Sequence, residues 1–155
     1  MIVWVDADAC PKPIKDILFR VAVKRQVKIC FVANSWLHLL KSDYIKLIIV
    51  EQGPDIADNK IVEECSVGDL VITADIPLAV RIVSKGALGL NPRGIIYDKN
   101  NIGAISDMRN FMSTLRNDGL VTGGPSSFSN KDSGKFANAI DKFIVHQIYN
   151  KESNV

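Results

Sequence analysis

The stretch Ile2-Val3-Trp4-Val5-Asp6-Ala7-Asp8-Ala9-Cys10-Pro11 decides the fold. Its first half is short, apolar and rich in β-branched residues, which is typical of a buried β-strand. The strand ends at two aspartates, Asp6 and Asp8, which are flanked by small residues. Because ligands of open α/β sheets bind just beyond the carboxyl ends of strands, this pair predicts a functional site. The alternative is that the acids only cap the helix that follows.

The composition is that of one globular domain. The chain has 155 residues, of which 47% are apolar, and we expect a single domain over residues 1–150 and a frayed tail over 151–155. A net charge of +2 does not imply nucleic-acid binding, although it leaves room for a local basic patch. The three cysteines form neither a zinc pattern nor a disulfide framework. The sequence shows no basic leader and no apolar run of membrane-spanning length. Together with the cysteine usage, this predicts a cytoplasmic protein without a membrane partner.

Apolar runs alternate with amphipathic segments along the chain. This alternation predicts an α/β fold, a three-layer sandwich with a mainly parallel central sheet flanked by helices. After the first strand we expect strands at 28–33, 45–50, 70–73 and 87–90, a short extended segment at 95–97, and helices at 11–26, 55–65, 76–84, 104–118 and 131–149.

Two segments near the C-terminus carry further predictions. The helix over 104–118 should bury a stripe of apolar residues, with its two methionines as core filler. The loop over 120–131 contains Gly123-Gly124-Pro125 and Phe128. A long Gly/Ser-rich loop in a small domain is often a binding loop or lid, and Phe128 should hold it against the protein. The alternative is that this loop is only a linker to the last helix. The apolar stripe predicted for the helix over 104–118 consists of Ile105, Met108, Phe111, Met112 and Leu115.

Acids recur where predicted elements meet. Asp75 follows the strand over 70–73 and precedes Pro77, which repeats the pattern of the opening stretch. Asp58 shares helical spacing with Ile61, and an acid on such an inward stripe is costly unless it is paired or bound to a cation. Its alternative role is to interact with the positive end of the helix dipole. Asp132 lies at the start of the last helix.

This set of acids predicts a metal site rather than a nucleophile-based one. The sequence offers no candidate Ser-His-Asp set and no phosphate-binding loop of the G-x-x-x-x-G-K-[ST] type. Carboxylates that are forced together repel one another, and a divalent cation removes that conflict. A site made only of carboxylates suits Mg²⁺ or Mn²⁺, and such ions activate water for attack on a phosphodiester or phosphomonoester.

Several unusual motifs occur in order along the chain: Asp6-Ala7-Asp8-Ala9-Cys10-Pro11, Gly53-Pro54-Asp55 with Asp58, 68–79 (GDLVITADIPLA), Leu90-Asn91-Pro92-Arg93-Gly94, Gly123-Gly124-Pro125 and Phe136-Ala137-Asn138. In these motifs the chain resembles the YaiI/YqxD family of uncharacterised bacterial proteins over nearly its whole length. That family is grouped with PIN-like domains, which are metal-dependent folds of ribonuclease type with acids at the strand ends.

The resemblance implies that Asp6, Asp58, Asp75 and Asp132 are the acids of such a site, and that Asp8 belongs to the family's opening motif. Two positions depart from the family pattern. Asn59 stands where the family usually has an acid, and Ser133 stands where it usually has an arginine. The second change removes a guanidinium that could hold phosphate.

The expected function is therefore cleavage of RNA phosphodiesters by a Mg²⁺- or Mn²⁺-dependent nuclease. Its catalytic residues would be Asp6, Asp58, Asp75 and Asp132, with Asp8 as an additional residue at the metal. Substrate contacts are expected from Arg93, Lys131, Lys135 and the loop over 123–129.

Two other functions stay open from the sequence. One is a phosphatase of the haloacid-dehalogenase kind, in which Asp6 and Asp8 would be nucleophile and acid. The other is a PIN-like module that binds RNA or a protein without cutting.

Overall fold

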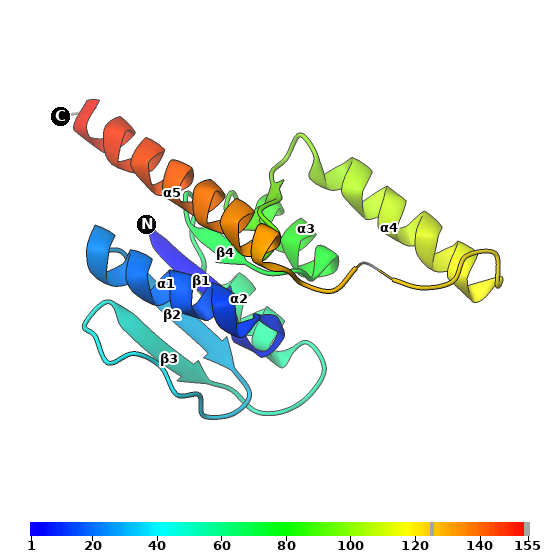
Figure 1. Cartoon of the computed structure of the whole chain (residues 1–155), viewed down its shortest axis with the longest axis horizontal. Coiled ribbons are helices and arrows are strands. Elements are labelled where there is room, and N and C mark those ends of the chain that lie inside the picture. The colour runs from blue at the N-terminus through cyan, green and yellow to red at the C-terminus, as the bar shows by residue number, and fades with distance from the viewer. Residues whose placement is uncertain (125, 154–155) are drawn as a thin grey trace.

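The protein is a twisted six-stranded sheet with helices packed on both faces, seen in a computed structural model that describes residues 1–124 and 126–153 (Figure 1). The predicted α/β sandwich is confirmed. The elements are β1 (Ile2–Asp6), a 3₁₀ turn η1 (Ala7–Ala9), α1 (Lys12–Arg25), β2 (Lys28–Ala33), β3 (Ile45–Ile49), α2 (Ile56–Glu64), β4 (Leu70–Ile72), α3 (Ile76–Ser84), β5 (Leu88–Leu90), β6 (Ile96–Tyr97), α4 (Ile102–Asn117) and α5 (Asn130–Ser153).

The strand order, β3-β2-β1-β4-β5-β6, puts the opening stretch at the centre of the sheet. Strands β1 to β5 run parallel, and only β6 is antiparallel to its neighbour. From β1 the chain builds the sheet toward β3, and it then returns to build the other half from β4. The switch point therefore lies between β1 and β4, where open α/β sheets bind their ligands at the carboxyl edge.

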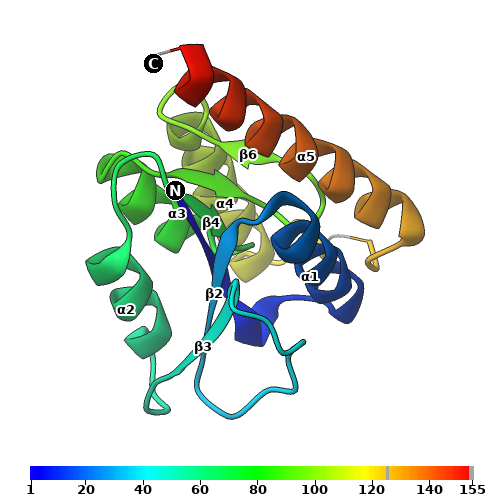
Figure 2. The same cartoon turned by 90° about the vertical axis from the view of Figure 1, so that its left-hand side faces the viewer.

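Alternation along β1 divides the core into two layers. Val3 and Val5 pack with α1 and α5 on one face of the sheet. Trp4 points to the other face and packs with α2 and α3. Figure 2 shows α1 and α5 on one side of the sheet and α2 on the other. Asp6 has the parity of Trp4, so its side chain belongs to the face that α2 and α3 cover.

The predicted burial of the α4 stripe is wrong. Met108 and Phe111 are 60% and 59% exposed, so Met108 is not core filler. Ile102 is buried and Ile105 is half-buried against α3. Met112 and Leu115 are also half-buried, so none of the five residues of the predicted stripe is fully buried. Beyond its first turns the helix projects away from the sheet (Figure 1). Helical periodicity predicts which residues share a face, but it does not predict that another element covers that face.

Helix α5 covers one face of the sheet and is longer than expected. It begins at Asn130 and continues through Ser153, so residues 151–153 of the expected frayed tail are helical, whereas 154 and 155 lie outside the described residues. Phe136, Ile140 and Ile144 are fully buried on its inner face. Phe128, in the loop before α5, is half-buried against the same core, as predicted, and Pro125 lies outside the described residues. None of the described helices is long and apolar enough to cross a membrane.

Candidate functional site

Asp6 and Asp75 are joined through a threonine at the carboxyl ends of β1 and β4. The Thr73 hydroxyl donates a hydrogen bond of 3.1 Å to Asp6 Oδ2, and it accepts one of 3.0 Å from the Asp75 backbone N–H. Asp75 Oδ1 in turn accepts a 2.9 Å bond from the Leu78 N–H and caps α3. The strand register explains this arrangement, because Val5 lies opposite Ile72, and Asp6 and Thr73 come next, just beyond this last pair of the β1–β4 ladder.

Asp6 is held in surroundings that disfavour its charge. Its pKa is raised to about 6, first by burial and also by the negative charges of Asp58, Asp75 and Asp8, while the hydrogen bond from Thr73 acts in the opposite direction. Each of these carboxylates comes from a different element of the fold. The pKa of Asp6 therefore reports a convergence of acids that lie far apart in the sequence.

Asp58 joins this group from the first turn of α2. Burial raises its pKa, the charges of Asp75 and Asp55 add to the effect, and Arg81 opposes them. Asp55 occupies the N-cap position of α2 in a left-handed conformation and makes no side-chain capping bond. Asn59 accepts a 2.8 Å bond from Arg81, so a guanidinium is fixed beside Asp58.

Asp8 lies at the edge of the acid cluster. Its Oδ2 accepts a 3.1 Å bond from the backbone N–H of Asn34, just beyond the end of β2. The side chain is exposed, and its charge acts on Asp6 more weakly than those of Asp58 and Asp75. Asp8 therefore ties η1 to the end of β2, while it adds negative charge to the site.

The structure does not group Asp132 with these acids. Asp132 Oδ2 accepts bonds from the backbone N–H and the hydroxyl of Ser129 at 3.0 and 3.2 Å, and Ser129 Oγ accepts a 3.4 Å bond from the Asp132 N–H. This is a capping box at the start of α5. The hydrogen bonds from Ser129 lower the pKa of Asp132, and Arg93 and Lys135 contribute to the same shift.

Arg93 fastens the turn after β5 to the start of α5. Its Nη1 lies 3.3 Å from Asp132 Oδ2, and its Nη2 donates to the carbonyl of Ser126 in the 120–129 loop. Gly94 lies so close to α5 that an added Cβ would meet the Lys135 carbonyl carbon at 2.8 Å. Arg93 and Lys135, predicted to contact substrate, therefore lie together, and Lys131 is exposed one turn before Lys135.

The acid cluster has the right donors for a hard divalent cation. Within the described residues, Asp6 Oδ1, Asp75 Oδ2 and the Asp58 carboxylate accept no hydrogen bond from the protein, while the other oxygens of Asp6 and Asp75 are engaged. The part of the chain that the structure describes contains no set of three or more His, Cys, Asp or Glu side chains arranged as metal ligands. Mg²⁺ commonly uses one or two carboxylates and retains water, which fits the acids that are present.

Sequence reasoning missed the role of one residue near these acids. Thr73 connects Asp6 to Asp75, and its position two residues before Asp75, at the end of an apolar strand, was the available signal. Ser133 Oγ is buried and has no hydrogen-bond partner among the described residues. Where the family pattern has an arginine, this chain therefore has a small buried hydroxyl group.

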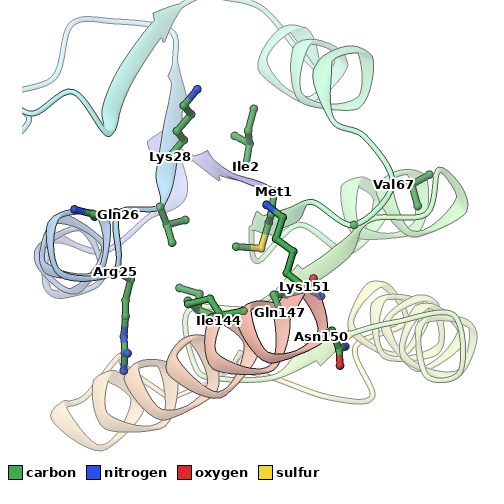
Figure 3. A pocket seen from close by; sticks show the side chains of 13 residues that line it. Met1, Ile2, Arg25, Gln26, Lys28, Val67, Ile144, Gln147, Asn150 and Lys151 are labelled. Carbon is green, nitrogen blue, oxygen red and sulfur yellow. The ribbon is translucent and has the colours of Figure 1, made fainter. Parts of the chain in front are cut away.

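Asp69, another buried acid, has a structural role at the opposite edge of the sheet. Its carboxylate accepts bonds from the Ile2 N–H, the Trp4 indole and the Ser66 N–H at 2.9, 3.0 and 2.9 Å. A pocket of about 630 Å³ lies at this amino edge, lined by Met1, Lys28 and Ile144 among others (Figure 3). Because the predicted site residues lie at the carboxyl edge, this pocket is not part of the candidate site.

The chain matches known proteins over nearly its whole length. A sequence profile described as "Uncharacterized BCR, YaiI/YqxD family" matches residues 4–146. A UPF0178 protein of Maridesulfovibrio salexigens is 54% identical over 148 residues, which cover 96% of this chain and 98% of the relative. A UPF0178 protein of Cellvibrio japonicus is 52% identical over 148 residues, with coverage of 95% and 98%. No solved structure matches the chain. The chain therefore belongs to the YaiI/YqxD family.

Proposed function

We propose that the protein is a Mg²⁺- or Mn²⁺-dependent nuclease that hydrolyses RNA phosphodiesters at the carboxyl edge of its sheet. The observation that carries the proposal is the convergence of Asp6, Asp58 and Asp75, whose like charges and burial raise the pKa values of Asp6 and Asp58. Structural carboxylates in proteins are usually paired with a cation or with N–H donors, as Asp69 is. Here each of Asp6 and Asp75 keeps one carboxylate oxygen without a protein donor, and the negative charges act on one another, which is typical of cation sites.

The proposed roles follow from which oxygen atoms are already engaged. Asp6 Oδ1 and Asp75 Oδ2 would hold the metal, since Thr73 and Leu78 occupy the other oxygens. When bound, the divalent cation supplies charge neutralisation for the phosphodiester and lowers the pKa of water. Asp58, whose pKa is raised, would orient the attacking water and take its proton.

On the substrate side, Asp132 would hold Arg93 in place rather than act in the acid cluster. The ion pair and the bond to Ser126 fix the guanidinium beside the 120–129 loop. A fixed guanidinium can present two N–H groups to phosphate oxygens. Asp132 thereby becomes a positioning residue in this proposal, and its loss should raise KM more than it lowers kcat.

The first test is RNA cleavage by Asp6→Asn. With Mn²⁺ present, we expect this variant to lose at least about 100-fold in cleavage rate, because Asn keeps the shape but not the charge that holds the cation. Release of fluorescence from a doubly labelled RNA oligonucleotide measures the rate. Asp107→Asn is the matched control, since Asp107 is exposed on α4, and it should leave the rate unchanged.

Equal cleavage by wild type and Asp6→Asn would contradict the proposal. A measurement of the melting temperature with and without Mn²⁺ distinguishes the nuclease from a module that binds RNA or a protein without cutting. Millimolar Mn²⁺ should raise the melting temperature of the wild-type protein and have a smaller effect on Asp6→Asn, because only the native state offers the assembled carboxylates. The absence of any Mn²⁺-dependent shift would favour the non-catalytic module.

A further inference from the structure

A groove of about 910 Å³ runs between α5 and the turn that joins β5 to β6. It begins at the Arg93–Asp132 ion pair and continues along the outer face of α5. Its cationic lining consists of Arg93, Lys135 and Lys142, and His146 lies at its far end.

The basic residues of α5 form one line along this groove. Lys135, Asn138, Lys142 and His146 recur at intervals of three or four residues, which places them on one side of the helix. The rise of 1.5 Å per residue spaces Lys135 and His146 about 16 Å apart along the helix axis. Asp141 lies on a different side and is paired with Arg25 at 2.8 Å.

The charge in the groove is not balanced internally. Asp132 is the acid among the lining residues, and Arg93 and Ser129 already engage its carboxylate. Lys135 and Lys142 are exposed and lie one after the other along the groove instead of converging on one point. Such an extended arrangement fits a chain of regularly spaced anions better than it fits a single phosphate.

The groove also offers apolar surface beside this line of charge. Ile95 is 51% exposed, and Ile96 and Ala139 line the wall. Binding of single strands generally combines a cationic track for the backbone with surfaces against which bases can pack. The imidazole of His146 supplies a flat ring at the far end of the groove.

We propose that this α5 groove binds the phosphate backbone of single-stranded RNA, with Arg93 at the end of the track nearest the carboxyl ends of the strands. The inference rests on the proposed nuclease function. It adds a binding track that starts at the carboxyl edge of the sheet and follows α5 toward the amino edge.

The test is binding of a labelled RNA oligonucleotide of roughly eight nucleotides by the full chain in EDTA, followed by fluorescence anisotropy. Lys142→Glu should weaken binding about tenfold at low salt. It should also reduce the slope of log K against log salt concentration by about 0.7, the contribution of one phosphate contact. Lys46→Glu is the matched control, since Lys46 is exposed on β3 at the far edge of the sheet, and it should bind normally.

Three results would overturn the groove proposal: equal losses in Lys142→Glu and Lys46→Glu, an unchanged salt slope, or full displacement of the RNA by low-millimolar inorganic phosphate. Because binding is measured without metal, the readout is independent of cleavage. If Lys142→Glu loses binding but the wild-type protein with Mn²⁺ does not cut RNA, the groove stands and the nuclease proposal fails. Circular dichroism of both variants checks that they are folded.

Discussion

Asp6 lowers the stability of the fold, because its side chain places a buried negative charge at the switch point between β1 and β4. Its carboxylate is buried and close to like charges, so the folded protein holds a proton more tightly than the unfolded chain does. The Thr73 hydroxyl offsets only part of this cost. Strain of this kind is characteristic of functional sites, because a purely structural position would be filled by an apolar or neutral side chain.

The sign of the pH dependence follows from this pKa. The pKa of Asp6 is about 6 in the folded protein and 3.8 in the ordinary, unfolded environment, so the folded state binds more protons between these values. In EDTA, stability should therefore fall as the pH rises from about 4 to about 6.5, by on the order of 3 kcal/mol from this group. Urea unfolding of wild type and Asp6→Asn across this range measures the effect.

Asp6→Asn should be the more stable of the two proteins at pH 8, and the two should converge below about pH 3, where Asp6 is largely protonated in both the folded and the unfolded state. The Asp107→Asn control should follow the wild-type curve, since its carboxylate is exposed. Parallel pH profiles for wild type and Asp6→Asn would show that the charge of Asp6 costs the fold nothing.

The turn after β5 packs directly against the backbone of α5. Gly94 has φ +90°, and a Cβ there would lie 2.9 Å from the Lys135 carbonyl oxygen. Gly94→Ala therefore combines an unfavourable backbone conformation with a clash against a helix backbone that cannot rotate away. We expect a loss of about 2–3 kcal/mol in the free energy of unfolding, measured by chemical denaturation.

Gly134→Ala is the matched control for this change. Gly134 lies in the first turns of α5, and nothing lies within 4 Å of the position its Cβ would take. Alanine has the higher helix propensity, so this variant should gain up to about 1 kcal/mol. Destabilisation of similar size in both variants would contradict this prediction, because it would show that the loss in Gly94→Ala does not come from the close contact between the turn and α5.

Helix α4 should tolerate polar substitutions that a buried stripe would not. Phe111 is 59% exposed, so Phe111→Ser should change the free energy of unfolding by less than about 1 kcal/mol. Phe136→Ser on α5 is the comparison, because Phe136 is fully buried, and it should cost about 3 kcal/mol or more. Thermal denaturation of the two variants distinguishes an exposed stripe from a core contact. A large loss in Phe111→Ser would contradict the exposed position of that side chain.

Across the molecule, the sequence predicts the layers better than it predicts the partners of individual side chains. The strand and helix periods identified the alternating elements, because local periodicity is set by the backbone and by burial on one face. The predicted burial of the α4 stripe was wrong, because the exposure of a helix face depends on which other element packs against it, and no local sequence pattern indicates that.

The candidate site divides in the same way. Asp6 and Asp75 could be predicted to converge, because parallel strands bring their carboxyl ends to one edge, whereas Asp58, on a helix, was placed with them by the resemblance. Asp132 could not be placed with them from its position at a helix start. The same position allows a capping box, and Ser129 three residues earlier is the local signal for one.

The position of α5 in the core has a consequence for synthesis of the chain. Phe136, Ile140 and Ile144 share one buried cluster with Val3 and Val5, so β1 is covered by a helix that is synthesised after all six strands of the sheet. At roughly 5–20 residues per second, the ribosome releases α5 seconds after the sheet-forming segments. During that interval the nascent chain exposes the apolar face that later packs under α5. Premature termination before Asn130 would make that exposure permanent, so truncated products should be substrates for chaperones and proteases.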